Sequence, residues 1–125
     1  MISRALFAGL LLAVSMPAMA QNMNADEFYQ RATKLKKKGA MAVFRMGEVK
    51  ALMKEGQAAG KASSAKYRAD KAAGKPLAYC PPAEARMDSD EYMKLLSAIP
   101  AAERRKINMT EATTRIMTIK YPCRT

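Results

Sequence analysis

Two cysteines, Cys80 and Cys123, carry the clearest chemistry in this chain of 125 residues. They are its only cysteines, so an intramolecular disulfide could form in one way only. Protein thiols oxidise in exported proteins and generally stay reduced in the cytosol. The compartment in which the protein folds therefore decides whether these two residues pair.

The N-terminus indicates that compartment. Arg4 precedes an apolar run from Ala5 to Val14, and Ala18-Met19-Ala20 follows as a small-x-small cleavage signature. We therefore predict a signal peptide over residues 1–20 and a mature protein that begins at Gln21 in the periplasm. The apolar run is shorter than the roughly twenty residues of a membrane-spanning helix, so we expect a protein that does not span the membrane. In an oxidising space, Cys80 and Cys123 are expected to form a structural disulfide.

The residues that most often perform catalysis are missing or explained otherwise. The chain has no histidine, which removes the commonest general base and metal ligand. The carboxylate pairs Asp26/Glu27 and Asp90/Glu91 fall in the first turns of predicted helices, where helix capping accounts for them. The methionines are scattered without a Met-x-x-Met array, so we interpret them as core residues rather than as copper(I) ligands. The sequence predicts a protein that is not an enzyme and uses no cofactor or metal.

The formal net charge of +11 points to an anionic partner. Thirteen Lys or Arg and five Asp or Glu lie within residues 21–79, against eight and six from residue 80 onward. Such a field suits nucleic acid, but export argues against that partner. A solvated surface, an acidic partner protein and an anionic envelope polymer or lipid headgroup remain as interpretations. The candidate partner-binding residues are the cations of the second half of a long helix: Lys61, Lys66, Arg68, Lys71 and Lys75.

Helical patterns fill the first half of the mature chain. Asn24 and Glu27 have the spacing of a capping box, and three lysines before Gly39 are typical of a helix end, which predicts a helix over residues 25–38. A short apolar segment over residues 41–46 runs into Gly47, and we expect a break or kink near that residue. A long, weakly amphipathic helix should then continue to residue 73 and stop at Gly74.

The second half predicts two more helices within a frame set by the cysteines. Prolines make residues 75–82 an extended connector. One helix should begin after Asp88 and end at Pro100, and a polar link over residues 101–106 should lead to a helix capped by Asn108. We expect an antiparallel hairpin over residues 80–123 whose ends lie close together. The stripe expected to be buried in the last helix comprises Met109, Ala112, Ile116 and Ile119. The sequence thus predicts one all-α domain over residues 21–125, a small bundle of about four helices with basic N-terminal helices over 21–75.

The C-terminal half resembles the periplasmic immunity proteins that protect bacteria against type VI secretion amidase effectors. The resemblance lies in the aromatic-Cys-Pro-Pro opening over residues 79–82, the helix ending in Ile99-Pro100, the short polar link and the aromatic-Pro-Cys closure over residues 121–123. It implies a small, disulfide-bonded helical protein, often a homodimer, that neutralises a cell-wall amidase by binding it. Family members commonly carry another cysteine pair in the N-terminal half, and none stands between Gln21 and Tyr79 here. The alternative function is that of a basic envelope-binding module for anionic polymer or lipid headgroups.

Export and oxidation can be tested together by intact mass spectrometry. We expect the protein recovered from the periplasm to begin at Gln21 and to be lighter by two hydrogens than the same protein after reduction, because the only two cysteines would be joined. Retention of residues 1–20, or two thiols that react with an alkylating reagent without prior reduction, would contradict the prediction.

Overall fold

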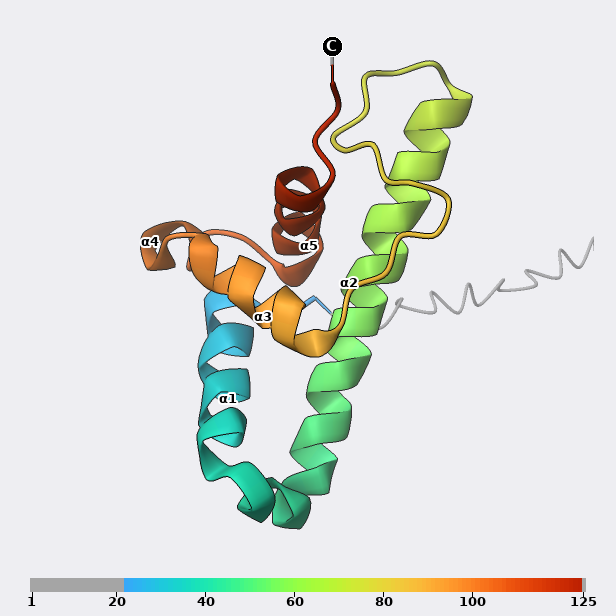
Figure 1. Cartoon of the computed structure of the whole chain (residues 1–125). Helices are drawn as coiled ribbons and strands as arrows, with labels where there is room; N and C mark the ends of the chain where they lie inside the picture. The colour runs from blue at the N-terminus through green and yellow to red at the C-terminus, as the bar shows by residue number, and fades with distance from the viewer. Residues whose placement is uncertain (1–21, 125) are drawn as a thin grey trace, which may run out of the picture.

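The structure, a computed structural model, describes residues 22–124 (Figure 1). This part of the chain is all-α, as predicted, with no strand among the described residues. None of these helices combines the length and the hydropathy of a membrane span. The predicted signal peptide lies outside the described residues. The elements are α1 (Ala25–Lys38), the 3-10 helix η2 (Gly39–Arg45), α2 (Met46–Ala72), α3 (Ser89–Ala98), α4 (Ala101–Arg104) and α5 (Met109–Lys120).

The first three elements form a long hairpin. Helix α1 has the predicted bounds, and the Asn24 side chain accepts hydrogen bonds from the backbone N–H groups of Asp26 and Glu27. The break expected near Gly47 is present at Arg45, which leaves the helical conformation (φ −121°, ψ 36°) between η2 and α2. The chain leaves α1 at Gly39, which adopts a positive φ of +53°.

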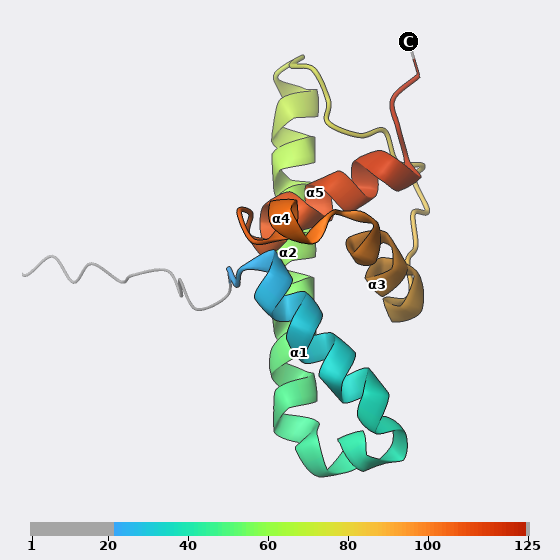
Figure 2. The ribbon, with the colours of Figure 1, turned by 90° about the vertical axis from the view of Figure 1, so that its left-hand side faces the viewer.

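Helix α2 is the longest element and supports the rest of the fold. It ends at Ala72, close to the predicted end, and Gly74 follows with a φ of +68°. Its buried residues are Leu52, Glu55, Ala59 and Ser63, which recur at helical spacing along one face. Helix α5 packs across this face, as Figures 1 and 2 show from two sides.

The core lies where α1, α2, α3 and α5 meet. Leu96, Met109 and Ile116 are fully buried there, and Phe28 of α1 packs against them with its ring edge toward Tyr92 of α3. Each of these four helices contributes buried apolar residues to the core. A helix buries its apolar stripe by packing it against other elements, and here four helices share one core.

The C-terminal segment is closed by the Cys80–Cys123 disulfide, as predicted. Its two main helices cross: α3 is seen along its length in Figure 1 and nearly end-on in Figure 2, whereas α5 shows the opposite. The polar link predicted over residues 101–106 contains the short helix α4. Ile119 was wrongly placed in the buried stripe, since it is 51% exposed. Because α5 packs across α2, its last turn passes beyond the core.

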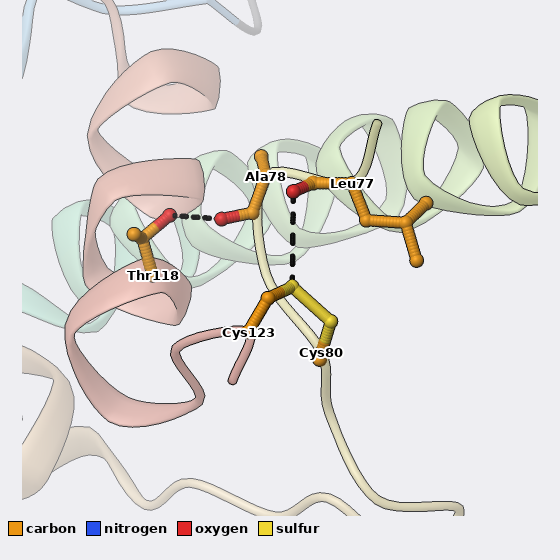
Figure 3. The surroundings of a disulfide bond; sticks show 5 residues. All are labelled: Leu77, Ala78, Cys80, Thr118 and Cys123. Atoms are coloured by element: carbon orange, nitrogen blue, oxygen red, sulfur yellow. Dashed lines mark hydrogen bonds between the residues drawn. A yellow bond between two sulfur atoms is a disulfide. The ribbon is translucent and has the colours of Figure 1, made fainter. Parts of the chain in front are cut away.

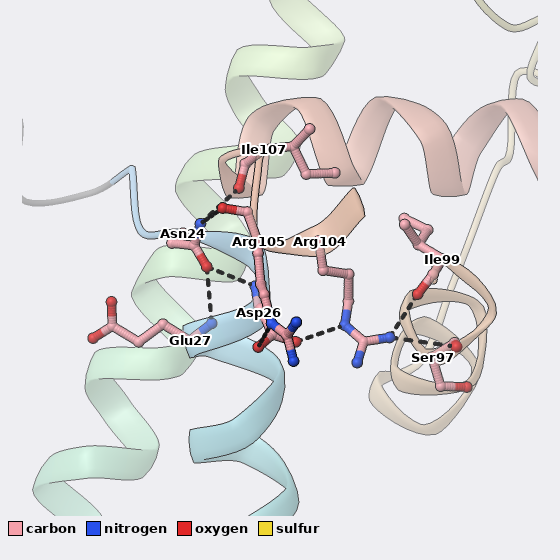
Figure 4. A network of polar contacts seen from close by, with 8 residues as sticks. All are labelled: Asn24, Asp26, Glu27, Ser97, Ile99, Arg104, Arg105 and Ile107. Atoms are coloured by element: carbon pink, nitrogen blue, oxygen red, sulfur yellow. Dashed lines mark hydrogen bonds and ion pairs between the residues drawn. The ribbon is translucent and has the colours of Figure 1, made fainter. Parts of the chain in front are cut away.

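A buried arginine joins the start of α1 to the end of α3 (Figure 4). The Arg104 side chain is 7% exposed, and its Nε donates to Asp26 Oδ1 at 3.1 Å. Its Nη1 donates to the carbonyl oxygen of Ile99 at 2.6 Å, and the guanidinium lies 4.0 Å from the centre of the Tyr29 ring. The buried guanidinium of Arg104 is thus paired with a carboxylate, hydrogen-bonded to a carbonyl and placed against an aromatic ring. A buried ion is tolerated only when its charge is compensated in this way.

Backbone hydrogen bonds continue this junction. The Ala25 N–H donates to the Ile107 carbonyl at 2.9 Å, and the Met109 N–H donates to the Met23 carbonyl at 2.8 Å. The Asn24 side-chain amide donates to the Arg105 carbonyl at 2.8 Å. The entry of α1 and the entry of α5 are therefore held together although about eighty residues separate them in sequence.

Arg104 should be necessary for folding stability. We expect Arg104→Met to lower the free energy of unfolding by about 3–5 kcal/mol, because Asp26 and the Ile99 carbonyl would lose their partner in the interior. Arg105→Met is the matched control: Arg105 is 69% exposed and lies 3.8 Å from the same carboxylate, so its loss should cost about 1 kcal/mol or less. Urea unfolding measures both values, and equal losses would contradict the assignment.

Candidate functional site

The disulfide joins the connector to the end of the chain (Figure 3). The Cα atoms of Cys80 and Cys123 lie 4.9 Å apart, and the Cys80 N–H donates to the Tyr121 carbonyl at 2.8 Å. One turn earlier, the Thr118 hydroxyl donates to the Ala78 carbonyl at 2.9 Å. Cys123 Sγ lies 3.7 Å from the Leu77 carbonyl oxygen, which is a packing contact because an oxidised sulfur has no proton to donate. The connector is thereby fixed along α5.

Tyr79, the aromatic residue before Cys80, anchors the connector to α2. It is 3% exposed, and its ring stacks on Tyr67 with 5.3 Å between the ring centres. Its hydroxyl shares a hydrogen bond with Ser63 Oγ at 3.1 Å, and Ser63 shares another with Thr114 of α5 at 2.8 Å. A chain of hydroxyl groups, buried at Ser63 and Tyr79 and partly buried at Thr114, thus joins the connector, α2 and α5.

A groove of about 550 Å³ lies between the last turns of α2 and the connector. Its lining includes the stacked rings of Tyr67 and Tyr79, here called the aromatic floor, together with Pro81, Pro82, Arg68 and Lys71. The Lys71 ammonium lies 5.9 Å from the centre of the Tyr67 ring. Cations beside an aromatic floor are suited to an acidic side chain that also presents carbon surface. We call this feature the distal groove.

The five cations predicted as a partner site differ in their relation to the distal groove. All five are exposed, but of them only Arg68 and Lys71 line the distal groove. Lys66 pairs with Asp70 at 2.6 Å, one turn along the helix. Lys61 and Lys75 lie outside the groove lining. The aromatic and proline residues of the groove were not predicted, because the contact of the connector with α2 is tertiary.

The carboxylate pairs noted in the sequence are held in ion pairs. Asp26 pairs with Arg104, and Glu27 lies 3.7 Å from an Arg31 nitrogen. Asp90 and Glu91 pair with Lys36 and Lys120. Within residues 22–124, no group of three or more His, Cys, Asp or Glu side chains gathers as a metal site would require.

The pKa values of Tyr92 and Lys120 are displaced from their ordinary values. Burial raises the pKa of Tyr92, although its hydrogen bond with Thr113 at 2.7 Å acts in the opposite direction. The hydrogen bond from Lys120 to Glu91 raises the pKa of Lys120. Both groups keep their ordinary charge at neutral pH, so they act as structural contacts.

The structure also has an apolar surface that the sequence interpretation did not identify. A groove of about 690 Å³ lies between α1, α2 and α3, lined mainly by Phe28, Leu35, Leu52, Met53 and Met93. Beside it, η2 has no buried residue. The apolar segment over residues 41–46 is the sequence signal for the exposed surface beside the groove.

Comparisons with known proteins identify no relative: no family model matches the chain, and no curated protein or solved structure is significantly similar to it.

The disulfide should stabilise the distal groove. We expect replacement of both cysteines, Cys80→Ser with Cys123→Ser, to cost about 2–5 kcal/mol of unfolding free energy, since the connector would lose its covalent link to α5. Reduction of the unaltered protein should give a similar loss, which makes it the internal control. A serine variant that melts with the oxidised protein would contradict this role.

Proposed function

We propose that this protein is a periplasmic binding protein of the immunity type, which neutralises a cell-wall amidase effector of type VI secretion by direct binding. The observation that carries the proposal is the aromatic-Cys-Pro-Pro and aromatic-Pro-Cys frame. Its two cysteines form a disulfide. Its first aromatic residue, Tyr79, is buried, and Pro81 and Pro82 line the distal groove. The frame therefore stabilises the fold through its disulfide and also contributes residues to the distal groove.

The distal groove is the partner site in this proposal. Arg68 and Lys71 supply positive charge at its margin, and the disulfide and the hydroxyl chain hold its walls before any partner arrives. A site that is already ordered loses little conformational entropy on binding, which favours tight inhibition. The positive charge would also speed the encounter with an acidic amidase surface.

The alternative, a basic envelope-binding module for anionic polymer or lipid headgroups, is favoured by a different observation. The exposed cations of α2 extend beyond the groove to Lys61, and the chain carries a net charge of +11. A polymer would be bound by the summed charge and would not require the aromatic floor of the groove. The two functions therefore differ in whether binding depends on the Tyr67 side chain and in how much binding affinity remains at high salt.

The test is binding to a peptidoglycan amidase effector of type VI secretion, with inhibition of peptidoglycan hydrolysis as the second readout. We expect Arg68→Glu with Lys71→Glu to weaken association by roughly tenfold or more, mainly through a slower on-rate. Lys94→Glu with Lys106→Glu is the matched control, because it reverses two exposed lysines on other elements and changes the net charge equally. Calorimetry and stopped-flow mixing measure the two effects.

The salt dependence separates the alternatives. An amidase inhibitor should keep a specific residual affinity above about 0.5 M salt, where exposed charges are screened within a few ångströms, and should lose it with Tyr67→Ala. A polymer-binding module should lose nearly all affinity at that salt and should respond equally to both charge-reversal pairs. Failure to bind or inhibit any amidase at low salt would reject the immunity function.

A further inference from the structure

Within residues 22–124, exposed large apolar side chains are concentrated at the turn between α1 and α2. Four large apolar side chains are exposed there within six residues, and we call them the apolar tip. The exposed fractions are 81% for Phe44, 66% for Val43, 61% for Met41 and 46% for Met46. Among the described residues, the other large apolar side chains exposed to this degree are Met53 and Ile119. Isolated exposed apolar residues need no explanation, but a cluster of this kind marks a contact surface.

The apolar tip is also a protrusion. In both views of the ribbon, η2 lies at the end of the α1–α2 hairpin that is farthest from α5 and the disulfide-closed segment (Figures 1 and 2). None of the η2 residues is buried. The tip therefore does not contribute to the core, and the fold has no reason of its own to place Phe44 there.

Cations surround the tip. Residues 34–54 contain seven Lys or Arg and a single carboxylate, Glu48. That carboxylate is already neutralised, since it pairs with Arg31 at 3.3 Å and Arg45 at 3.6 Å. Lys37, Lys38 and Lys50 are exposed and make no ion pair within residues 22–124. Exposed apolar side chains flanked by unpaired lysines are complementary to a lipid bilayer, in which anionic headgroups lie above the hydrocarbon chains.

We propose that the apolar tip inserts into the headgroup and upper acyl region of a bilayer that contains anionic phospholipid. Phe44 and Val43 would enter the acyl boundary while Lys37, Lys38 and Lys50 bind the phosphate groups. The helical backbone of η2 and the adjoining helices satisfies its own hydrogen bonds, so little polar backbone would be desolvated. The shape decides against a protein partner, because a convex tip offers a folded protein little area to bury.

This orientation would point the distal groove away from the membrane, because the groove and the tip lie toward opposite ends of α2. The inference does not rest on the proposed function. An amidase inhibitor or a polymer-binding module could both be held at a membrane surface in this way.

Vesicle flotation tests the insertion. The protein is used without residues 1–20, because their apolar run would itself bind lipid. All residues of the core, which lie between 25 and 116, are retained. We expect binding to vesicles of phosphatidylglycerol and phosphatidylethanolamine and at least about tenfold weaker binding to pure phosphatidylcholine. Phe44→Ser with Val43→Ser should reduce partitioning by roughly tenfold or more. The control is Ile119→Ser, which removes an exposed apolar residue elsewhere and should change nothing.

A fluorescence measurement locates the contact. The chain has no tryptophan, so Phe44→Trp introduces a single indole at the tip. Its emission should shift to the blue on addition of anionic vesicles and should be quenched by lipids brominated near the carbonyl end of the acyl chain. Lys37→Glu with Lys38→Glu should abolish the shift, whereas Lys94→Glu with Lys106→Glu should leave most of it.

Three results would overturn the proposal. The first is an absence of binding to anionic vesicles by the folded protein. The second is binding that Phe44→Ser with Val43→Ser does not weaken while its melting temperature is unchanged. The third is a blue shift of the indole without lipid that depends on protein concentration, which would show that the tip packs against a second copy instead.

Discussion

The fold depends on how Arg104 is neutralised inside the protein. This guanidinium lies on the short helix α4, and its partners are a carboxylate from the start of α1, a carbonyl from the end of α3 and an aromatic ring of α1. A buried cation tolerates few arrangements of its neighbours, because each lost partner leaves an uncompensated charge. It therefore specifies how α1 meets the C-terminal segment, where apolar packing alone would accept several alternatives.

Helix α5 is held at each of its two ends by contacts with other parts of the chain. At its entry, backbone hydrogen bonds join Met109 to Met23, just before α1, and Ile107 to Ala25, the first residue of α1. At its exit, the disulfide and the Thr118 hydroxyl join it to the connector. Helix α5 is thus held at both ends while its middle packs across α2. A helix fixed in this way gives the connector a rigid support, and the distal groove takes its shape from that support.

The long helix α2 separates two surfaces of different chemistry. Toward its C-terminal end, cations stand beside an aromatic floor, whereas at its N-terminal end exposed apolar residues are surrounded by lysines. Few of its residues are buried, so most of its length is free to carry charge. Our two proposals use these surfaces separately: a protein partner at the distal groove and a lipid surface at the tip.

Much of the secondary structure followed from the sequence by itself. Local signals placed α1, the capped starts of α3 and α5 and the non-helical connector, because caps, glycines and prolines act within a few residues. The two cysteines allowed one pairing, which the structure contains. Tertiary structure decided the rest. Arg104 became buried, Ile119 became exposed, and Tyr67 met Tyr79, because these outcomes depend on how helices cross. Of the five cations predicted as a site, the fold brought Arg68 and Lys71 to one groove and paired Lys66 with Asp70, since charge along a sequence does not specify which cations will share a surface.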